Sequence, residues 1–200
     1  MWRSALVCVA FAAALLQVDA CTNLIVTPGA SVDEGTIYSY SADSAALYGT
    51  LDRLPGRKNI TAGSMKKIYD WDSGVYLGEI EEVEETYDVI GNMNEFQLTI
   101  GETTFGGVPQ LTQGQQGAIM DYGNLIWTTL QRAKTVPQAI SVMSSLVSRY
   151  GYASEGESFT LTGVCLLVLL PVSLLTVVSK DQKLLEQDSS ISPLILAFNP

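Results

Sequence analysis

The chain has 200 residues, enough for one modest domain or for part of a larger one. It carries 11 Lys and Arg against 21 Asp and Glu, a formal net charge of −10, and this sign argues against binding to the phosphate backbone of nucleic acids. The absence of His excludes Ser-His-Asp and Cys-His catalysis within the chain and most zinc and haem sites. Three Cys without a CxxC pair exclude a disulfide scaffold and a Cys-built metal site.

The first 20 residues are typical of a secretory signal peptide. Arg3 precedes an uncharged run from Ala5 to Leu16, and Val18 and Ala20 occupy the −3 and −1 positions of a cleavage site. A membrane anchor is the alternative, but this run is too short to cross a hydrocarbon core about 30 Å thick. Cleavage predicts a secreted protein, or one in an endomembrane or lysosome-like lumen, that begins at Cys21.

Short β-branched and apolar runs, separated by turns rich in Gly and Asp, predict strands over residues 22–26, 36–41, 66–70, 76–79, 87–90 and 97–100. The first two strands are expected to form a hairpin. After residue 117 the apolar residues follow helical spacing instead. One helix is predicted after Asp121, and a second begins at Thr135-Val136-Pro137 and stops at Gly151. Strands followed by a helix pair predict an α+β fold.

Two polar segments lie between the predicted strands. Asn59-Ile60-Thr61 is an N-glycosylation sequon, which gains weight from the signal peptide. Residues 79–85 hold five Glu in seven positions. This run lacks the Asp/Asn-Gly loop of an EF-hand, so a solvated face is favoured over a calcium site.

A second apolar segment covers residues 159–178, which are twenty uncharged residues in succession. Their number meets the length rule for a transmembrane segment, and Lys180 and Lys183 follow it. One alternative is a buried core element of the domain. Another is that the residues from about 160 onward are not the natural continuation of the domain.

Cys21 is the strongest candidate for a catalytic residue, because cleavage after Ala20 would give it a free α-amine. An α-amine has a pKa of about 7.7–8.0 and a thiol one of about 8.5, so at neutral pH the amine can take the thiol proton. This is nucleophilic catalysis with the base supplied by the chain terminus, and it needs no His. A buried structural Cys and a lipoprotein anchor are the alternatives.

Two further residues are candidates for the same chemistry. Asn94, in the Asn92–Glu95 segment between two predicted strands, can offer N–H donors to a developing oxyanion, or it can be an ordinary turn residue. Asp43 follows the second predicted strand. It can hold the terminal amine as a cation or orient a substrate amine, and its alternative is also a turn residue.

Eight stretches carry a resemblance to a known family: Cys21–Val26, Tyr40–Ser44, Tyr69–Gly74, Gly91–Gln97, Ile100–Gly107, Met120–Gly123, Leu130–Ala133 and Tyr150–Phe159. In this order they resemble the cysteine dipeptidases related to bacterial dipeptidase A and the secernins, which are N-terminal-nucleophile hydrolases. The resemblance covers roughly residues 21–159 and implies an αββα sandwich with the nucleophile at the start of its first strand.

The resemblance also implies the roles of the site residues. Cys21 would attack the carbonyl of a dipeptide or short peptide, its own amine would act as the base, Asn94 would lie in the oxyanion hole, and Asp43 would be a carboxylate near the nucleophile. No metal and no organic cofactor are implied.

From Thr160 onward the chain departs from the family pattern, so we expect residues 160–200 to be a divergent apolar tail and the sandwich to be incomplete at its C-terminal end. Because the chain departs from the family pattern here, the resemblance by itself does not establish that this chain is an active peptidase. The competing hypothesis is a non-enzymatic, acidic glycoprotein associated with a membrane through residues 159–178.

Overall fold

The computed structural model describes residues 21–42, 49–106, 116–163 and 167–171. Three antiparallel sheets and two α-helices form this part of the chain. The small sheets pair β1 (Thr22–Val26) with β2 (Ile37–Ser41) and β4 (Met65–Tyr69) with β5 (Tyr76–Glu81). A short 3-10 helix, η1 (Pro28–Ala30), lies between β1 and β2.

The largest sheet has six strands in the order β10-β9-β8-β7-β6-β3. Its strands are β3 (Arg53–Leu54), β6 (Val89–Ile90), β7 (Met93–Asn94), β8 (Thr99–Gly106), β9 (Gly156–Thr162) and β10 (Leu167–Pro171). β8 and β9 form its long central pair, in a register that places Thr99 opposite Thr162 and Thr104 opposite Glu157. This register brings two segments together that lie on either side of the helices in sequence.

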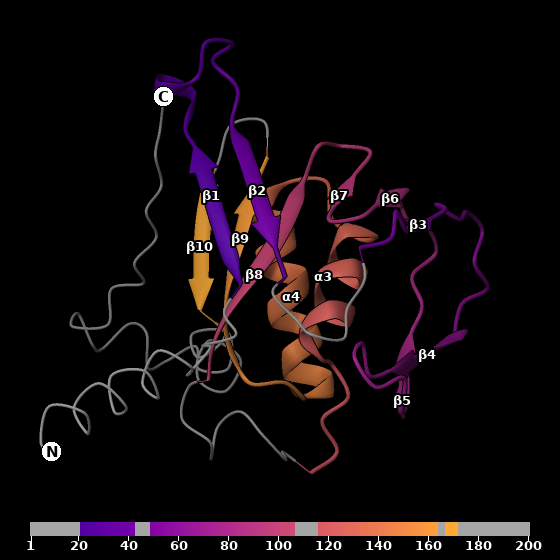
Figure 1. Ribbon diagram of the computed structural model, residues 1–200. Coiled ribbons are helices and arrows are strands. Elements are labelled where there is room, and N and C mark those ends of the chain that lie inside the picture. Colours follow the sequence, from indigo (N-terminus) through magenta and orange to yellow (C-terminus); the bar gives the residue numbers. More distant parts are fainter. Residues whose placement is uncertain (1–20, 43–48, 107–115, 164–166, 172–200) are drawn as a thin grey trace, which may run out of the picture.

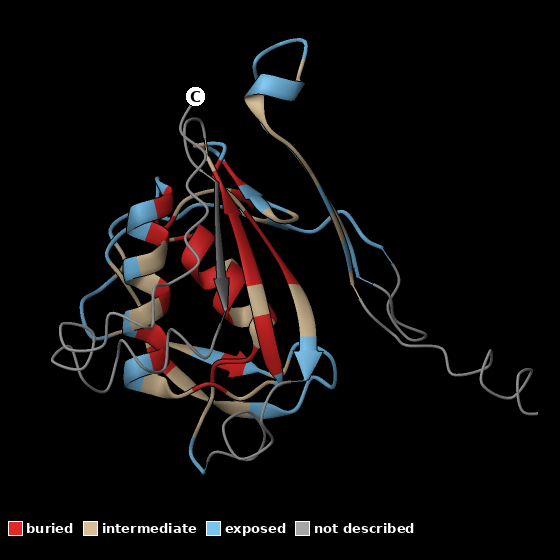
Figure 2. Ribbon diagram, turned by 90° about the vertical axis from the view of Figure 1, so that its left-hand side faces the viewer, coloured by how far each residue is buried: buried red, intermediate tan, exposed pale blue. Residues whose placement is uncertain are grey.

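The two helices, the six-stranded sheet and the β1–β2 pair form three layers. The helices α3 (Tyr122–Leu130) and α4 (Val136–Tyr150) cover one face of the six-stranded sheet, and the β1–β2 pair lies across its other face (Figures 1 and 2). The α+β arrangement expected from the sequence is therefore present. The layers seen are helical, sheet and sheet; the second helical layer of the expected αββα sandwich is not among the described residues.

The core lies between the six-stranded sheet and the helices (Figure 2). α4 turns Ala139, Met143, Leu146 and Val147 inward, as its helical spacing predicts, and all four are buried. They join fully buried sheet residues such as Ile100, Phe159 and Leu161 in one continuous cluster.

Local signals define the start of both helices and the end of α4. Asp121 is the N-cap of α3, with its Oδ1 accepting the Asn124 N–H at 2.7 Å, and Thr135 caps α4. Gly151 follows α4 with φ 69°, a left-handed value that favours Gly. The two helices and the β1–β2 hairpin predicted from the sequence are thus confirmed.

Some strand predictions differ from the structure. The predicted strand 97–100 begins at Thr99 and continues to Gly106, through a Gly-containing stretch. The predicted strand 87–90 is reduced to Val89–Ile90, and Met93–Asn94 forms a short strand where a turn was expected. These strands are defined by their pairing partners across the sheet, which local sequence does not encode.

The apolar segment 159–178 is sheet in its described part. Residues 159–162 belong to β9, and residues 167–171 form β10, which pairs with β9 antiparallel. Phe159 and Leu161 are fully buried. At these two positions the segment is therefore a buried core element, one of the alternatives that the sequence left open. In the part of the chain that the structure describes, no helix is long and apolar enough to cross a membrane. Residues 164–166 and 172–178 lie outside the described residues.

Candidate functional site

The β1–β2 hairpin presents one face to the six-stranded sheet. Along it, half-buried side chains alternate with exposed ones: Asn23, Tyr38 and Tyr40 are half-buried, whereas Leu24 and Ile37 are 66% and 58% exposed. Cys21 immediately precedes β1 and is half-buried. The alternation therefore places Cys21 and two tyrosines against β8.

A buried carboxylate in β8 contacts the Cys21 sulfur. The thiol donates to Oε1 of Glu102 at 3.1 Å, and the Tyr40 hydroxyl donates to the same oxygen at 2.6 Å. The other carboxylate oxygen, Oε2, accepts from the Thr104 hydroxyl at 3.3 Å. Glu102 is only 2% exposed, and buried carboxylates persist in proteins when hydrogen bonds of this kind compensate for lost hydration.

Asn23 ties β1 to β8 beside this contact. Its Nδ2 donates to the backbone oxygen of Glu102 at 2.8 Å and to the Thr103 hydroxyl, and its Oδ1 accepts from the Tyr38 hydroxyl. Gly101 lies directly under Tyr38: a Cβ at this position would be 1.9 Å from the Tyr38 hydroxyl oxygen. The close approach of β2 to β8 therefore requires Gly here.

A second buried carboxyl group lies in β9. Glu157 is 2% exposed, and among the described residues nothing forms a hydrogen bond with its Oε2. Burial raises the pKa of Glu157 to about 9, and the negative charge of Glu102 contributes. Glu157 is therefore a neutral acid at neutral pH.

The tyrosines of β2 are neutral hydrogen-bond donors. Burial raises the pKa of Tyr38 above its usual value, and burial together with the hydrogen bond to Glu102 does the same for Tyr40. Their hydroxyls therefore keep their protons, and the negative charge beside Cys21 is that of Glu102.

A cleft of about 620 Å³ adjoins this site, and its volume is in the range of pockets that bind small molecules. Tyr40 lines the cleft and also contacts Glu102, which links the cleft to Cys21. Aromatic side chains form much of the lining, with Trp71 and Trp127 packed edge to face at 4.5 Å between ring centroids. The lining consists of Tyr40, Ser41, Ala42, Gly49, Thr50, Asp52, Trp71, Gly91, Asn92, Tyr122, Gly123, Ile126 and Trp127.

The α3 N-terminus positions one aromatic wall of the cleft. Asp121 Oδ2 accepts the backbone N–H of Trp71 at 3.2 Å. Gly123 then allows the ring to approach, since a Cβ on Gly123 would lie 2.4 Å from Trp71 ring atoms. The Tyr122 hydroxyl donates to Asp72 Oδ1 at 2.8 Å at the same wall. Asp121 therefore both caps α3 and holds Trp71 in the wall of the cleft.

The structure thus brings together a half-buried thiol, a buried carboxylate and an adjacent cleft. The model of peptidase family C69 matches residues 53–164, more than half of the chain. The chain belongs to peptidase family C69. These are the cysteine peptidases related to dipeptidase A and the secernins, as the resemblance predicted. No curated protein matches the chain.

The region that matches family C69 includes Glu102 and Glu157 as well as α3 and α4, and it begins after Cys21. Neither Glu was identified as a site residue from the sequence, although both lie in stretches that carry the resemblance. Local sequence carried no clear signal of their burial, because Glu102 lies between Gly101 and Thr103, and Glu157 lies between Gly156 and Ser158.

Asn94, the predicted oxyanion-hole residue, is buried and fully hydrogen-bonded in the structure. It is 4% exposed, and its Nδ2 donates to the backbone oxygens of Leu130 at 2.9 Å and Ala133 at 2.7 Å. Its Oδ1 accepts from the backbone N–H groups of Phe96 and Leu98. Both amide hydrogens are therefore used to fasten the β7 turn to the end of α3, and an oxyanion role would require these bonds to break.

The other predicted site residues are Asp43 and Asn59. Asp43 lies outside the described residues. Asn59 is exposed in a loop with φ 56°, a left-handed value that Asn tolerates better than most residues. Its side chain is therefore accessible to a glycosyltransferase.

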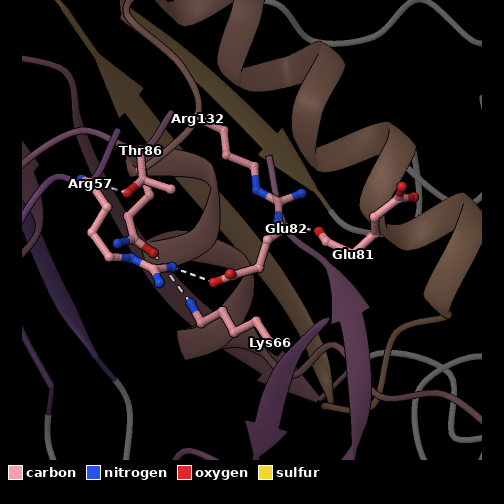
Figure 3. A network of polar contacts seen from close by, with 7 residues as sticks. Arg57, Lys66, Glu81, Glu82, Thr86 and Arg132 are labelled. Atoms are coloured by element: carbon pink, nitrogen blue, oxygen red, sulfur yellow. Dashed lines mark hydrogen bonds and ion pairs between the residues drawn. The ribbon is translucent and has the colours of Figure 1, made fainter. Parts of the chain in front are cut away.

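The acidic run 79–85 belongs to a second polar cluster, near β4 and β5 (Figure 3). Within this run three carboxylates form ion pairs: Glu81 with Arg149, Glu82 with Arg57 and Glu85 with Lys58. Among the described residues no group of His, Cys, Asp or Glu is suited to hold a metal ion. Ion pairs with Lys or Arg therefore account for three of the five Glu in this run.

Lys66 belongs to the same polar cluster (Figure 3). Its Nζ donates to Gln131 Oε1 at 3.2 Å, and Arg132 donates to the backbone oxygen of Glu81 at 2.7 Å (Figure 3). Burial, then the nearby charges of Arg132 and Arg57, lower the pKa of Lys66 to about 8. Burial and two nearby positive charges therefore disfavour the protonated form of Lys66.

Proposed function

We propose that this chain is a cysteine dipeptidase whose nucleophile is Cys21, made N-terminal by removal of residues 1–20. Membership of peptidase family C69 supports peptide hydrolysis. The observation that carries the assignment to Cys21 is the contact of its thiol with Glu102, next to a cleft of about 620 Å³. The chain contains no His that could act as the base instead.

The proposed reaction proceeds through an acyl-enzyme. The Cys21 sulfur attacks the peptide carbonyl carbon as the thiol proton passes to the α-amine of the same residue. The resulting ammonium then donates a proton to the leaving amine as the peptide C–N bond breaks, leaving a thioester. A water molecule, deprotonated by the same amine, hydrolyses the thioester, and the thiol and the free amine are restored.

The cleft favours short substrates with apolar side chains. Its aromatic walls, Trp71 and Trp127, offer apolar contact, and Asp52 adds a carboxylate to the lining. A carboxylate of this kind can attract the free ammonium group of a dipeptide. These features support a dipeptide or short peptide as the substrate.

The test is hydrolysis of a panel of dipeptides by chain that begins at Cys21. We expect Cys21→Ala to abolish release of amino acids, whereas the matched variant Cys165→Ala should retain the activity. Residual turnover above a few per cent in Cys21→Ala would exclude Cys21 as the nucleophile. Chain that retains residues 1–20 should be inactive, because its Cys21 has no free amine; equal activity there would refute the role of the amine as base.

We also propose that the protein enters the secretory pathway. The segment 1–20 has the order of a signal peptide, and the exposed sequon at Asn59 would be accessible in the lumen. The mass and the N-terminal sequence of protein from its native source test this. Any first residue other than Cys21 contradicts the mechanism, and retention of residues 1–20 contradicts the location as well. The competing hypothesis of a membrane anchor rests on the uncharged run 159–178, of which residues 159–162 and 167–171 are paired strands.

A further inference from the structure

We propose that Glu102 is a positioning residue for the nucleophile: its carboxylate accepts the thiol hydrogen of Cys21, fixes the sulfur beside the cleft and holds the thiol protonated until the α-amine takes the proton. This inference rests on the proposed function, because it takes Cys21 as the nucleophile. It concerns a residue 81 positions further along the chain.

The contacts of Glu102 restrain Cys21 from two directions. Through its side chain, Oε1 accepts from the thiol at 3.1 Å and from Tyr40 at 2.6 Å. Through its main chain, the carbonyl oxygen accepts from Asn23 at 2.8 Å, two residues after Cys21. Both ends of this short stretch of chain are therefore held to the same residue of β8, which limits the positions that the sulfur can adopt.

Glu102 carries the main charge that acts on the Cys21 thiol, because the other titratable groups nearby are neutral. The titratable groups that interact with Cys21 or Glu102 are Tyr38 and Tyr40 from β2, Tyr122 from α3, Tyr152 after α4, and Glu157 from β9. The phenols are neutral because burial raises their pKa values, and the raised pKa of Glu157, about 9, keeps that group neutral as well. One negative charge thus lies against the sulfur, and a like charge disfavours the thiolate.

The same charge has the opposite effect on the α-amine of Cys21. When the amine takes the thiol proton it becomes an ammonium on the residue that Glu102 contacts, and the carboxylate stabilises it by Coulomb attraction in a partly buried site. Glu102 therefore disfavours a free thiolate but favours the ammonium that forms during attack. Loss of its charge should make the thiol more reactive towards simple reagents and less effective in hydrolysis.

The first experiment measures the rate at which iodoacetamide alkylates Cys21 in the full chain, followed by mass spectrometry of the Cys21 peptide across neutral to alkaline pH. In the full chain the Cys21 nitrogen is part of a peptide bond, so the rate reports on the thiol and its neighbours without the amine. The variant is Glu102→Gln, which keeps the shape of the side chain and removes its charge. The control is Glu84→Gln, at an exposed position.

We expect Glu102→Gln to move the midpoint of the pH profile down by about one unit. A lower thiol pKa also lowers the intrinsic nucleophilicity of the thiolate, so the net gain in alkylation rate at neutral pH is about threefold. Tyr40→Phe should move the midpoint upward, because it removes a hydrogen bond that disperses the Glu102 charge. An unchanged profile in both variants, with Glu84→Gln also unchanged, would overturn the proposal.

The second experiment measures dipeptide hydrolysis by chain that begins at Cys21. We expect Glu102→Gln to lower kcat at least about tenfold with little change in KM, since the interaction strengthens as the ammonium forms. If the alkylation profile shifts but the unaltered protein hydrolyses no dipeptide, the proposed function fails and the Glu102–Cys21 contact stands. If the unaltered protein is active and Glu102→Gln keeps its kcat, the positioning role is refuted and the proposed function stands.

Discussion

Replacement of Glu157 by Gln should remove a large pH dependence of stability. Glu157 is 2% exposed and ionises in the folded protein with a pKa of about 9, against an ordinary value of 4.5. Burial is the main cause, and the charge of Glu102 is the next. Because the folded state binds this proton more tightly than the unfolded state does, the contribution of Glu157 to stability is fully present below pH 4.5 and is lost progressively up to about pH 9.

The magnitude follows from the size of the pKa difference. Each pH unit above 4.5 lowers the free energy of unfolding by about 1.4 kcal/mol. The free energy of unfolding is therefore lower by about 3 kcal/mol at neutral pH and by about 6 kcal/mol at about pH 9. These figures are comparable with the whole stability of a typical small domain. The group therefore makes the folded state sensitive to pH in the neutral range.

The assay is urea denaturation of the full chain at a series of pH values, followed by tryptophan fluorescence. The free energy of unfolding of Glu157→Gln minus that of the unaltered protein should rise with a slope of about 1.4 kcal/mol per pH unit. The slope is the decisive quantity, since a buried Gln amide adds a cost that does not vary with pH. The exposed variant Glu84→Gln should show no slope, and parallel curves for Glu157→Gln and the unaltered protein would refute the reasoning.

Four further predictions concern single residues. Gly101→Ala should displace Tyr38, whose hydroxyl oxygen lies 1.9 Å from the new Cβ, and should destabilise the fold by about 1–3 kcal/mol in a urea titration; an unchanged midpoint would contradict the close packing. Lys66→Met should stabilise the protein most below pH 8, where the unfavourable cation is present, and this gain should shrink as pH rises towards 10.5; a gain independent of pH would contradict the lowered pKa. Asp121→Ala should cost about 1–2 kcal/mol through loss of the α3 cap, with a weaker Trp fluorescence change on peptide binding because Trp71 loses its anchor; full stability would show that the cap is dispensable. Asn59→Gln should remove a glycan seen as a mobility shift in protein from a eukaryotic secretory host; identical mobility would show that the sequon is unused.

Local sequence was sufficient where a structure depends on neighbouring residues. The helices begin after Asp121 and Thr135, and α4 ends before Gly151, as the sequence predicted. Caps can be recognised in this way because they act through backbone groups a few residues away. The β1–β2 hairpin was predicted for a similar reason, since its two strands are close in sequence. The absence of His and the chemistry of an N-terminal Cys were also available without a structure, and they led to Cys21 as the candidate nucleophile.

The surroundings of Cys21 depended on tertiary structure. Glu102 lies 81 residues from Cys21 in sequence, and Glu157 comes beside β8 only through the pairing of β8 with β9. The sequence predicts Asn94 as an oxyanion donor, and only the tertiary structure shows that its amide hydrogens bond to the backbone oxygens of Leu130 and Ala133. Burial and long-range pairing decide whether a polar side chain is free to react, because both depend on which distant segments fold against it.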